Sequence, residues 1–230
     1  MSVSVDASSV PTAHAADVSR RRAWALAGTV GGLGGLVGLF VTVAATEADR
    51  ALFVDNARYI ASLDGNEGWV WAYQIVTSLA AGCLAVFAAG LRRRLAGREP
   101  VGSLVPDLAA VGLLLTAALL LVGGGVATEL YFSLLHVDET DPDTVAGLAA
   151  GYNTFPWVWA GIGLTAAAVA AAGLRRRAVS RWFAVFSLLM ALLVAATQLV
   201  PLQYLALVPG GLWATVAGLT FALERRRIGN

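Results

Sequence analysis

The chain has 230 residues, of which 58% are hydrophobic and only 13% are charged, and its mean hydropathy is +0.71. A soluble domain carries about a quarter charged residues on its hydrated surface, so this composition excludes an ordinary soluble protein and indicates a membrane protein. The formal net charge of +1 gives no indication of a nucleic-acid partner, and the single cysteine excludes an intramolecular disulfide.

The N-terminal segment, residues 1–19, is rich in Ser, Ala and Val and shows no periodicity, so we expect a disordered cytoplasmic tail there. Residues 20–230 contain six continuous apolar stretches, each close to the length of about 20 residues that a helix needs to cross a bilayer. They predict one transmembrane domain, an all-α bundle of six helices. The predicted spans cover about residues 23–46, 69–91, 105–128, 155–174, 182–200 and 202–223.

The first span has an alternative interpretation as an export signal, because three arginines precede it and Val43-Ala44-Ala45 resembles a cleavage site. Its apolar run is longer than the roughly 7 to 15 residues of a signal core. We therefore expect an uncleaved first helix.

Arginine placement predicts the orientation of the bundle. Of the 16 basic residues, all of them arginine, only Arg50 and Arg58 fall on one side of the predicted spans. The others form four clusters on the opposite side, at residues 20–22, 92–98, 175–181 and 225–227. Because arginine-rich loops face the cytoplasm, both termini are predicted to be cytoplasmic, in the plasma membrane of the cell.

Two loops on the predicted outer side carry further signals. Residues 47–68 include apolar residues at roughly helical spacing, which favours a short helix lying on the membrane surface. In residues 129–151 the third helix is expected to continue past the lipid before an acidic segment, where Asp141 and Pro142 are typical of a helix start. A divalent cation bound to this acidic segment is the less favoured alternative. The remaining loops are short, so sequential helices are expected to pack as antiparallel neighbours.

The first span is unusually rich in glycine. Small residues spaced four apart let another helix backbone come close, and such a face serves either packing within the bundle, which we favour, or a homodimer interface. This predicted helix-packing face consists of Gly28, Gly31, Gly32, Gly34, Gly35 and Gly38.

The spans contain little that could carry chemistry. No Asp, Glu, Lys, Arg or His lies near the middle of a predicted span. Asp107, the nearest, stands at a helix start, where a carboxylate complements the helix dipole. No predicted span contains a histidine, so the sequence predicts no bis-histidine haem inside the membrane and no evident base to activate a Ser or Cys nucleophile there. We therefore expect a protein without catalytic activity, cofactor or metal.

Polar and aromatic residues gather in the predicted outer halves of several helices, among them Tyr152, Asn153 and Thr154 before the fourth span and Gln203 and Tyr204 in the last hairpin. We hypothesise a shallow outward-facing solute pocket with Gln74 and Glu129 at its base. Its residues would be Gln74, Glu129, Tyr73 and Gln198. The alternative, which we favour, is that such side chains gather at any membrane interface.

The arginine-flanked hairpins, Arg181-Trp182 before the fifth span and the terminal Glu224-Arg225-Arg226-Arg227 resemble uncharacterised six-helix membrane proteins of GC-rich bacteria. This resemblance implies a topology and no site residues. Two functions remain open, and from the sequence we favour the first. The first is a structural or accessory subunit, with the lipid bilayer and another copy or another membrane subunit as partners. The second is a small permease or channel-like protein for a neutral or amphiphilic solute.

Overall fold

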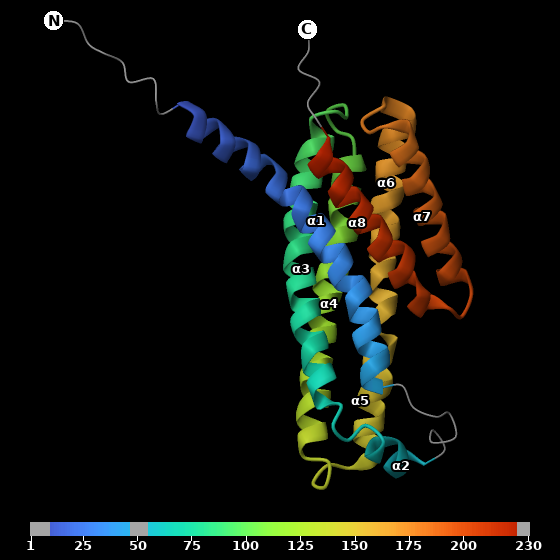
Figure 1. Cartoon of the computed structure of the whole chain (residues 1–230). Helices are drawn as coiled ribbons and strands as arrows, with labels where there is room; N and C mark the ends of the chain where they lie inside the picture. Colours follow the sequence, from blue (N-terminus) through green and yellow to red (C-terminus); the bar gives the residue numbers. More distant parts are fainter. Residues whose placement is uncertain (1–9, 47–54, 225–230) are drawn as a thin grey trace, which may run out of the picture.

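The structure, a computed structural model, describes residues 10–46 and 55–224, and every regular element in these two segments is a helix (Figure 1). The elements are α1 (Val10–Thr46), α2 (Asn56–Ala61), α3 (Glu67–Ala96), α4 (Val105–Leu135), α5 (Pro142–Thr154), the 3-10 helix η3 (Phe155–Ala160), α6 (Gly161–Arg176), α7 (Arg181–Leu199), the 3-10 helix η4 (Gln203–Ala206) and α8 (Leu207–Leu223).

Within the described residues, six helical segments are long and apolar enough to cross a membrane, which confirms the predicted number of spans and the all-α fold. They are Ala23–Thr46, Glu67–Ala96, Val105–Leu135, Pro142–Arg176, Arg181–Leu199 and Gln203–Leu223. The chain is therefore a multi-pass helical membrane protein.

Two predicted boundaries need correction. The fourth span begins at Pro142 rather than at residue 155, because α5, η3 and α6 follow one another without a break. Asp141 caps this segment, its carboxylate accepting a hydrogen bond from the Thr144 amide at 2.9 Å. At the other end of the chain, α1 begins at Val10, so residues 10–19 are helical rather than a disordered tail. Three alanines in that segment favour a helix, and residues 1–9 lie outside the described part.

The two ends of the bundle differ in charge. We call the end that carries Arg92–Arg94, Arg98 and Arg175–Arg177 the arginine-rich end, and the end that carries α2 and the α4–α5 connection the distal end (Figure 1). Asp107 lies in the first turn of α4 at the arginine-rich end, where its carboxylate pairs with Arg92 Nε at 2.6 Å.

The packing order differs from the chain order at the last helix. α3 packs against α4, α4 against α6, and α6 against α7, as expected of sequential neighbours. α8, in contrast, packs mainly along α1 and contacts α7 much less (Figure 1). The turn that joins α7 to α8 also stops well short of the distal ends of α3, α4 and α5 (Figure 1). The expectation of antiparallel packing between sequential helices therefore fails for the last pair.

Close contacts explain why α8 selects α1. A side chain at Gly32 would meet the backbone of α8, since its Cβ would lie 2.4 Å from Thr215 N. Gly218 approaches α1 in the same way, with its Cβ position 2.2 Å from Thr29 N. Two glycines that face the partner backbone allow the helices to touch along their main chains, where dispersion and weak hydrogen bonds act.

All six glycines of the predicted helix-packing face lie inside the bundle. Gly28, Gly31, Gly34 and Gly38 face side chains of α3, Gly32 faces α8, and Gly35 faces the Trp159 ring. This arrangement is the intramolecular packing favoured from the sequence.

Aromatic side chains fill the core of the arginine-rich half. Trp24 stacks on Phe87 at a centroid distance of 5.8 Å, and Phe183 stacks on Trp213 at 6.3 Å. The Trp213 indole donates a hydrogen bond to Ser187 Oγ at 2.9 Å, and both residues are buried. Rings from α1, α3, α7 and α8 thus close the centre of the bundle in this half.

A second core occupies the distal end. Tyr59, Ile60 and Leu63, in and after α2, pack with Tyr73 of α3 and Tyr152 of α5. Helix α2 is predicted to lie on the membrane surface, but its apolar side chains point into this core instead. Contact with the bundle buries more of their apolar surface than contact with lipid along one face would. The distal end is therefore a packed cap on the bundle.

Candidate functional site: a neutral pocket at the α7–α8 turn

The pocket lies where the fourth membrane segment meets the α7–α8 turn. Pro156 stands in the first turn of η3, and because proline has no N–H the chain tightens there into a 3-10 helix before α6 begins. This local change places Trp157 on the outside of the bundle, 39% exposed. On the opposite side, α7 ends at Leu199 and Pro201 turns the chain into η4. Elements η3 and η4 contact each other across this junction.

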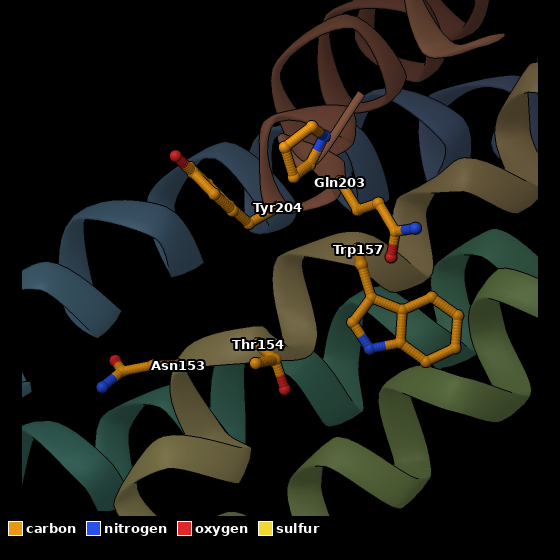
Figure 2. Close-up of a pocket in the computed structure, with 6 residues that line it drawn as sticks. Asn153, Thr154, Trp157, Gln203 and Tyr204 are labelled. Atoms are coloured by element: carbon orange, nitrogen blue, oxygen red, sulfur yellow. The ribbon is translucent and has the colours of Figure 1, made fainter. Parts of the chain in front are cut away.

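Between these elements is a cavity of about 370 Å³. Figure 2 shows Gln203 and Tyr204 on one wall and Asn153, Thr154 and Trp157 on the other. Its lining residues are Asn153, Thr154, Trp157, Pro201, Gln203 and Tyr204. We call these six residues the distal pocket. A volume of this size lies within the range of small-molecule sites, about 300 to 1,000 Å³.

The distal pocket carries hydrogen-bonding groups but no charge. The Gln203 amide, the Tyr204 hydroxyl and the Trp157 indole N–H make no hydrogen bond within the part of the chain that the structure describes. The Thr154 hydroxyl donates to the Gly151 carbonyl at 2.7 Å, so it offers the cavity only its acceptor lone pairs. Amide, hydroxyl and indole groups beside an aromatic wall suit an uncharged polar ligand better than an ion.

Asn153 connects the pocket to a polar network in the distal cap. Its side-chain oxygen accepts a hydrogen bond from Thr46 of α1, and the Thr46 hydroxyl also lies 2.9 Å from the Thr42 carbonyl. Tyr59 of α2 hydrogen-bonds Asn153 as well, while its burial raises the pKa of the phenol above its ordinary value. One wall of the pocket is therefore held by contacts from two other elements, α1 and α2.

The four residues predicted to form a solute pocket do not line this cavity. Tyr73 is buried in the distal core, with its ring 4.7 Å from that of Tyr152, and Gln74 is half-buried beside Gly124 of α4. Glu129 is exposed on α4, and Gln198 of α7 donates to Thr197 Oγ1 at 3.2 Å. Their proposed role in binding a solute stays a prediction.

The residues that do line it come partly from the wider set of distal polar residues singled out in the sequence, namely Asn153, Thr154, Gln203 and Tyr204. Trp157 and Pro201 were not among the candidates. The only sequence signals for them were an interfacial tryptophan and a proline turn, and neither signal says that the two segments meet.

Metal binding finds no support in the acidic segment. Among the described residues no group of three or more His, Cys, Asp or Glu side chains is close enough to hold a metal ion. Asp141 is engaged as a helix cap, and Asp143 accepts a hydrogen bond from the Asn56 side chain at 2.7 Å.

Comparison with known proteins gives no match to a family model, a curated protein or a solved structure. The function therefore rests on the chemistry of the site itself.

Proposed function

We propose that this protein is a small permease-like protein of the plasma membrane, with both termini in the cytoplasm, that binds a neutral or amphiphilic solute in the distal pocket. The observation that supports this proposal is the cavity of about 370 Å³ lined by uncharged hydrogen-bonding groups and an aromatic side chain. Three of those groups have no partner among the described residues, so a ligand would gain hydrogen bonds there without breaking any within the protein.

Its place in the fold also supports solute binding. The pocket lies where η3, in the middle of the fourth membrane segment, contacts η4 at the start of the sixth. Trp157 and Tyr204 are the amphipathic aromatic residues typical of a membrane interface. With the arginine-rich end in the cytoplasm, the pocket faces the outer side, where a solute would enter.

The accessory-subunit function is the second candidate, and the exposed face of α7 favours it. Helix α7 is the least buried of the six membrane segments, because only about one third of the residues in its most apolar part are buried. Its lipid-facing side chains would contact a second membrane protein in that case. The glycine face of α1 adds no support, since it is occupied within the bundle.

Native mass spectrometry of the protein released gently from its own membrane tests the two functions. We expect a monomer that carries a reproducible small-molecule or lipid mass. Gln203→Leu, which removes a pocket amide, should lower the occupied fraction at least threefold. Gln198→Leu is the matched control. Gln198 is also a glutamine and lies at the end of α7, close in the chain to Gln203, but it does not line the pocket.

The opposing results are distinct. Equal loss of the bound mass in both variants would move the site away from the distal pocket and toward the residues named from the sequence. A second protein bound at a fixed ratio, without a small-molecule mass, would favour the accessory function.

A further inference from the structure

A second cavity lies at the arginine-rich end, between the start of α7 and the end of α8. Its volume is about 500 Å³. It is lined by Val179, Ser180, Trp182, Val216, Leu219, Thr220, Phe221, Leu223 and Glu224. Trp182, Leu219 and Leu223 are between 42% and 73% exposed, so the cavity opens toward the surface that lipid covers.

The two cavities stand at opposite ends of one helix pair. Helices α7 and α8 are joined by the turn at Pro201, yet α7 packs mainly on α6 and α8 mainly on α1. The seam between α7 and α8 is therefore the least tightly packed junction between sequential membrane helices in the described structure. The distal pocket lies beside its turn, and the second cavity lies at its opposite end.

A layer of buried side chains closes the seam between the cavities. It includes Ser187 and Phe183 of α7 and Trp213 of α8, all three fully buried. Ser187 lies between Trp182 and Pro201 along α7, and Trp213 lies between Tyr204 and Val216 along η4 and α8. The layer is polar at one point, because the Trp213 indole donates to Ser187 Oγ at 2.9 Å.

The flanks of the seam are apolar and face lipid. Exposed side chains on α7 are Trp182, Val185, Leu188, Leu189, Leu192 and Leu193, and on α8 they are Val208, Leu212, Leu219 and Leu223. A molecule in the seam thus has hydrogen-bonding groups on its inner side and hydrocarbon on its outer side. This combination fits an amphiphile with a polar head and an apolar tail.

We infer that the seam between α7 and α8 is the route of the solute, and that the solute is a membrane lipid with an uncharged, hydrogen-bonding headgroup. This inference rests on the proposed function. The headgroup occupies the distal pocket, crosses past Ser187 and Trp213, and reaches the second cavity, while the tail stays in the bilayer. The Trp213 indole donates to Ser187 Oγ when the seam is closed and to the headgroup when it opens, so the indole N–H is not stranded in the apolar interior.

The uncharged headgroup follows from the lining of the distal pocket. None of its six residues is charged. A phosphate in this pocket would find hydrogen-bond donors but no cationic side chain to balance its charge, whereas the hydroxyl groups of a glycosyl headgroup can bond Gln203, Tyr204 and Asn153 without a charge to balance.

The test is lipid movement in phosphatidylcholine vesicles that contain the full-length protein and a trace of a fluorescent monoglycosyl diacylglycerol. Dithionite bleaches only the probe in the outer leaflet, so bleaching beyond that fraction measures crossing. We expect crossing with the wild-type protein and not in protein-free vesicles. Ser187→Ala removes the hydrogen bond that closes the seam and should speed crossing about threefold, the factor that corresponds to about 0.6 kcal/mol for an average interhelical hydrogen bond in a membrane.

Thr165→Val is the matched control. The Thr165 hydroxyl is also buried and donates across a helix interface, to the Ala109 carbonyl at 2.9 Å, but it joins α6 to α4 outside the seam. This variant should leave the rate unchanged. Equal rates in Ser187→Ala and Thr165→Val would overturn the seam as the route, while the pocket would stand if Gln203→Leu still lost its bound mass. Equally fast crossing of fluorescent phosphatidylglycerol would overturn the uncharged headgroup.

A labelling experiment covers the case in which Ser187→Ala folds poorly. In a Cys83→Ala background, Ser187→Cys should react with a membrane-permeant maleimide in vesicles, because opening of the seam exposes position 187. Thr165→Cys, equally buried in the closed bundle, should not react. Matching reactivity at the two positions would contradict an opening seam.

Discussion

Threonine side chains show how single polar residues are accommodated inside this bundle. Several hydroxyls bond the carbonyl four residues earlier on the same helix, so they leave no unsatisfied polar atom in the membrane. In four cases the acceptor is a glycine: Thr42 with Gly38, Thr116 with Gly112, Thr128 with Gly124 and Thr215 with Gly211, at 2.8 to 3.1 Å. Hydroxyls that satisfy themselves in this way are structural, which explains why buried threonines marked no site.

Gly35 of α1 packs so closely against Trp159 that one added carbon atom should destabilise the fold. The Cβ of an alanine there would lie 2.0 Å from Trp159 Cζ2, and the Trp159 side chain is 1% exposed and has no room to move. We expect Gly35→Ala to lower the free energy of unfolding by about 1–3 kcal/mol through overpacking. Thermal unfolding in detergent measures the effect. Gly82→Ala is the control, because nothing lies within 4 Å of its Cβ position; equal shifts in both variants would contradict this explanation.

At the scale of the element, α2 depends on its contacts rather than on its own sequence. A helix of six residues is too short to be stable alone. It is capped by Asp55, whose carboxylate accepts from the Arg58 amide at 3.2 Å, and it is held by the buried side chains of Tyr59 and Ile60. The amphipathic spacing predicted the helix, but only the packed distal end decided that it lies on the bundle and not on lipid.

The docking of α2 is predicted to depend on pH. Burial raises the pKa of the Tyr59 phenol above its ordinary value near 10, so the folded state favours the neutral side chain. The contribution of Tyr59 is then fully present below about pH 10 and is lost as the pH rises through the raised value. Above pH 10, hydrogen exchange of residues 56–61 should accelerate more than the base-catalysed exchange of an unfolded peptide does. Tyr59→Phe has no proton to lose, so an identical increase in that variant would exclude this cause.

At the scale of the whole molecule, charge decides which end faces the cytoplasm. The described arginines of the loops lie almost entirely at one end, which predicts a cytoplasmic arginine-rich end. Cysteine labelling in intact cells measures this with a Cys83→Ala background. Glu139→Cys at the distal end should react with an impermeant maleimide, whereas Val101→Cys, on a fully exposed loop residue, should react only after permeabilisation. The reverse pattern would invert the protein and place the distal pocket in the cytoplasm.

Composition and periodicity by themselves determined that this protein has six membrane helices, because about 20 apolar residues in a row have no stable place in water. They also predicted the Asp141 cap and the extension of α4 to Leu135, since both depend on residues close in the chain. Depth along a helix can be counted from the sequence at about 1.5 Å per residue. The polar residues at the distal end were identified in this way.

Tertiary structure alone decided which of those residues meet. Gln74 and Glu129 have a suitable depth, but the direction of a side chain around its helix and the identity of the neighbouring helix depend on backbone contacts far apart in sequence. Glycines at 32 and 218 bring α8 against α1 and away from α7, and the early turn at Pro201 brings Gln203 and Tyr204 beside Asn153 and Trp157. These contacts arise from close packing of whole helices, which no local pattern encodes.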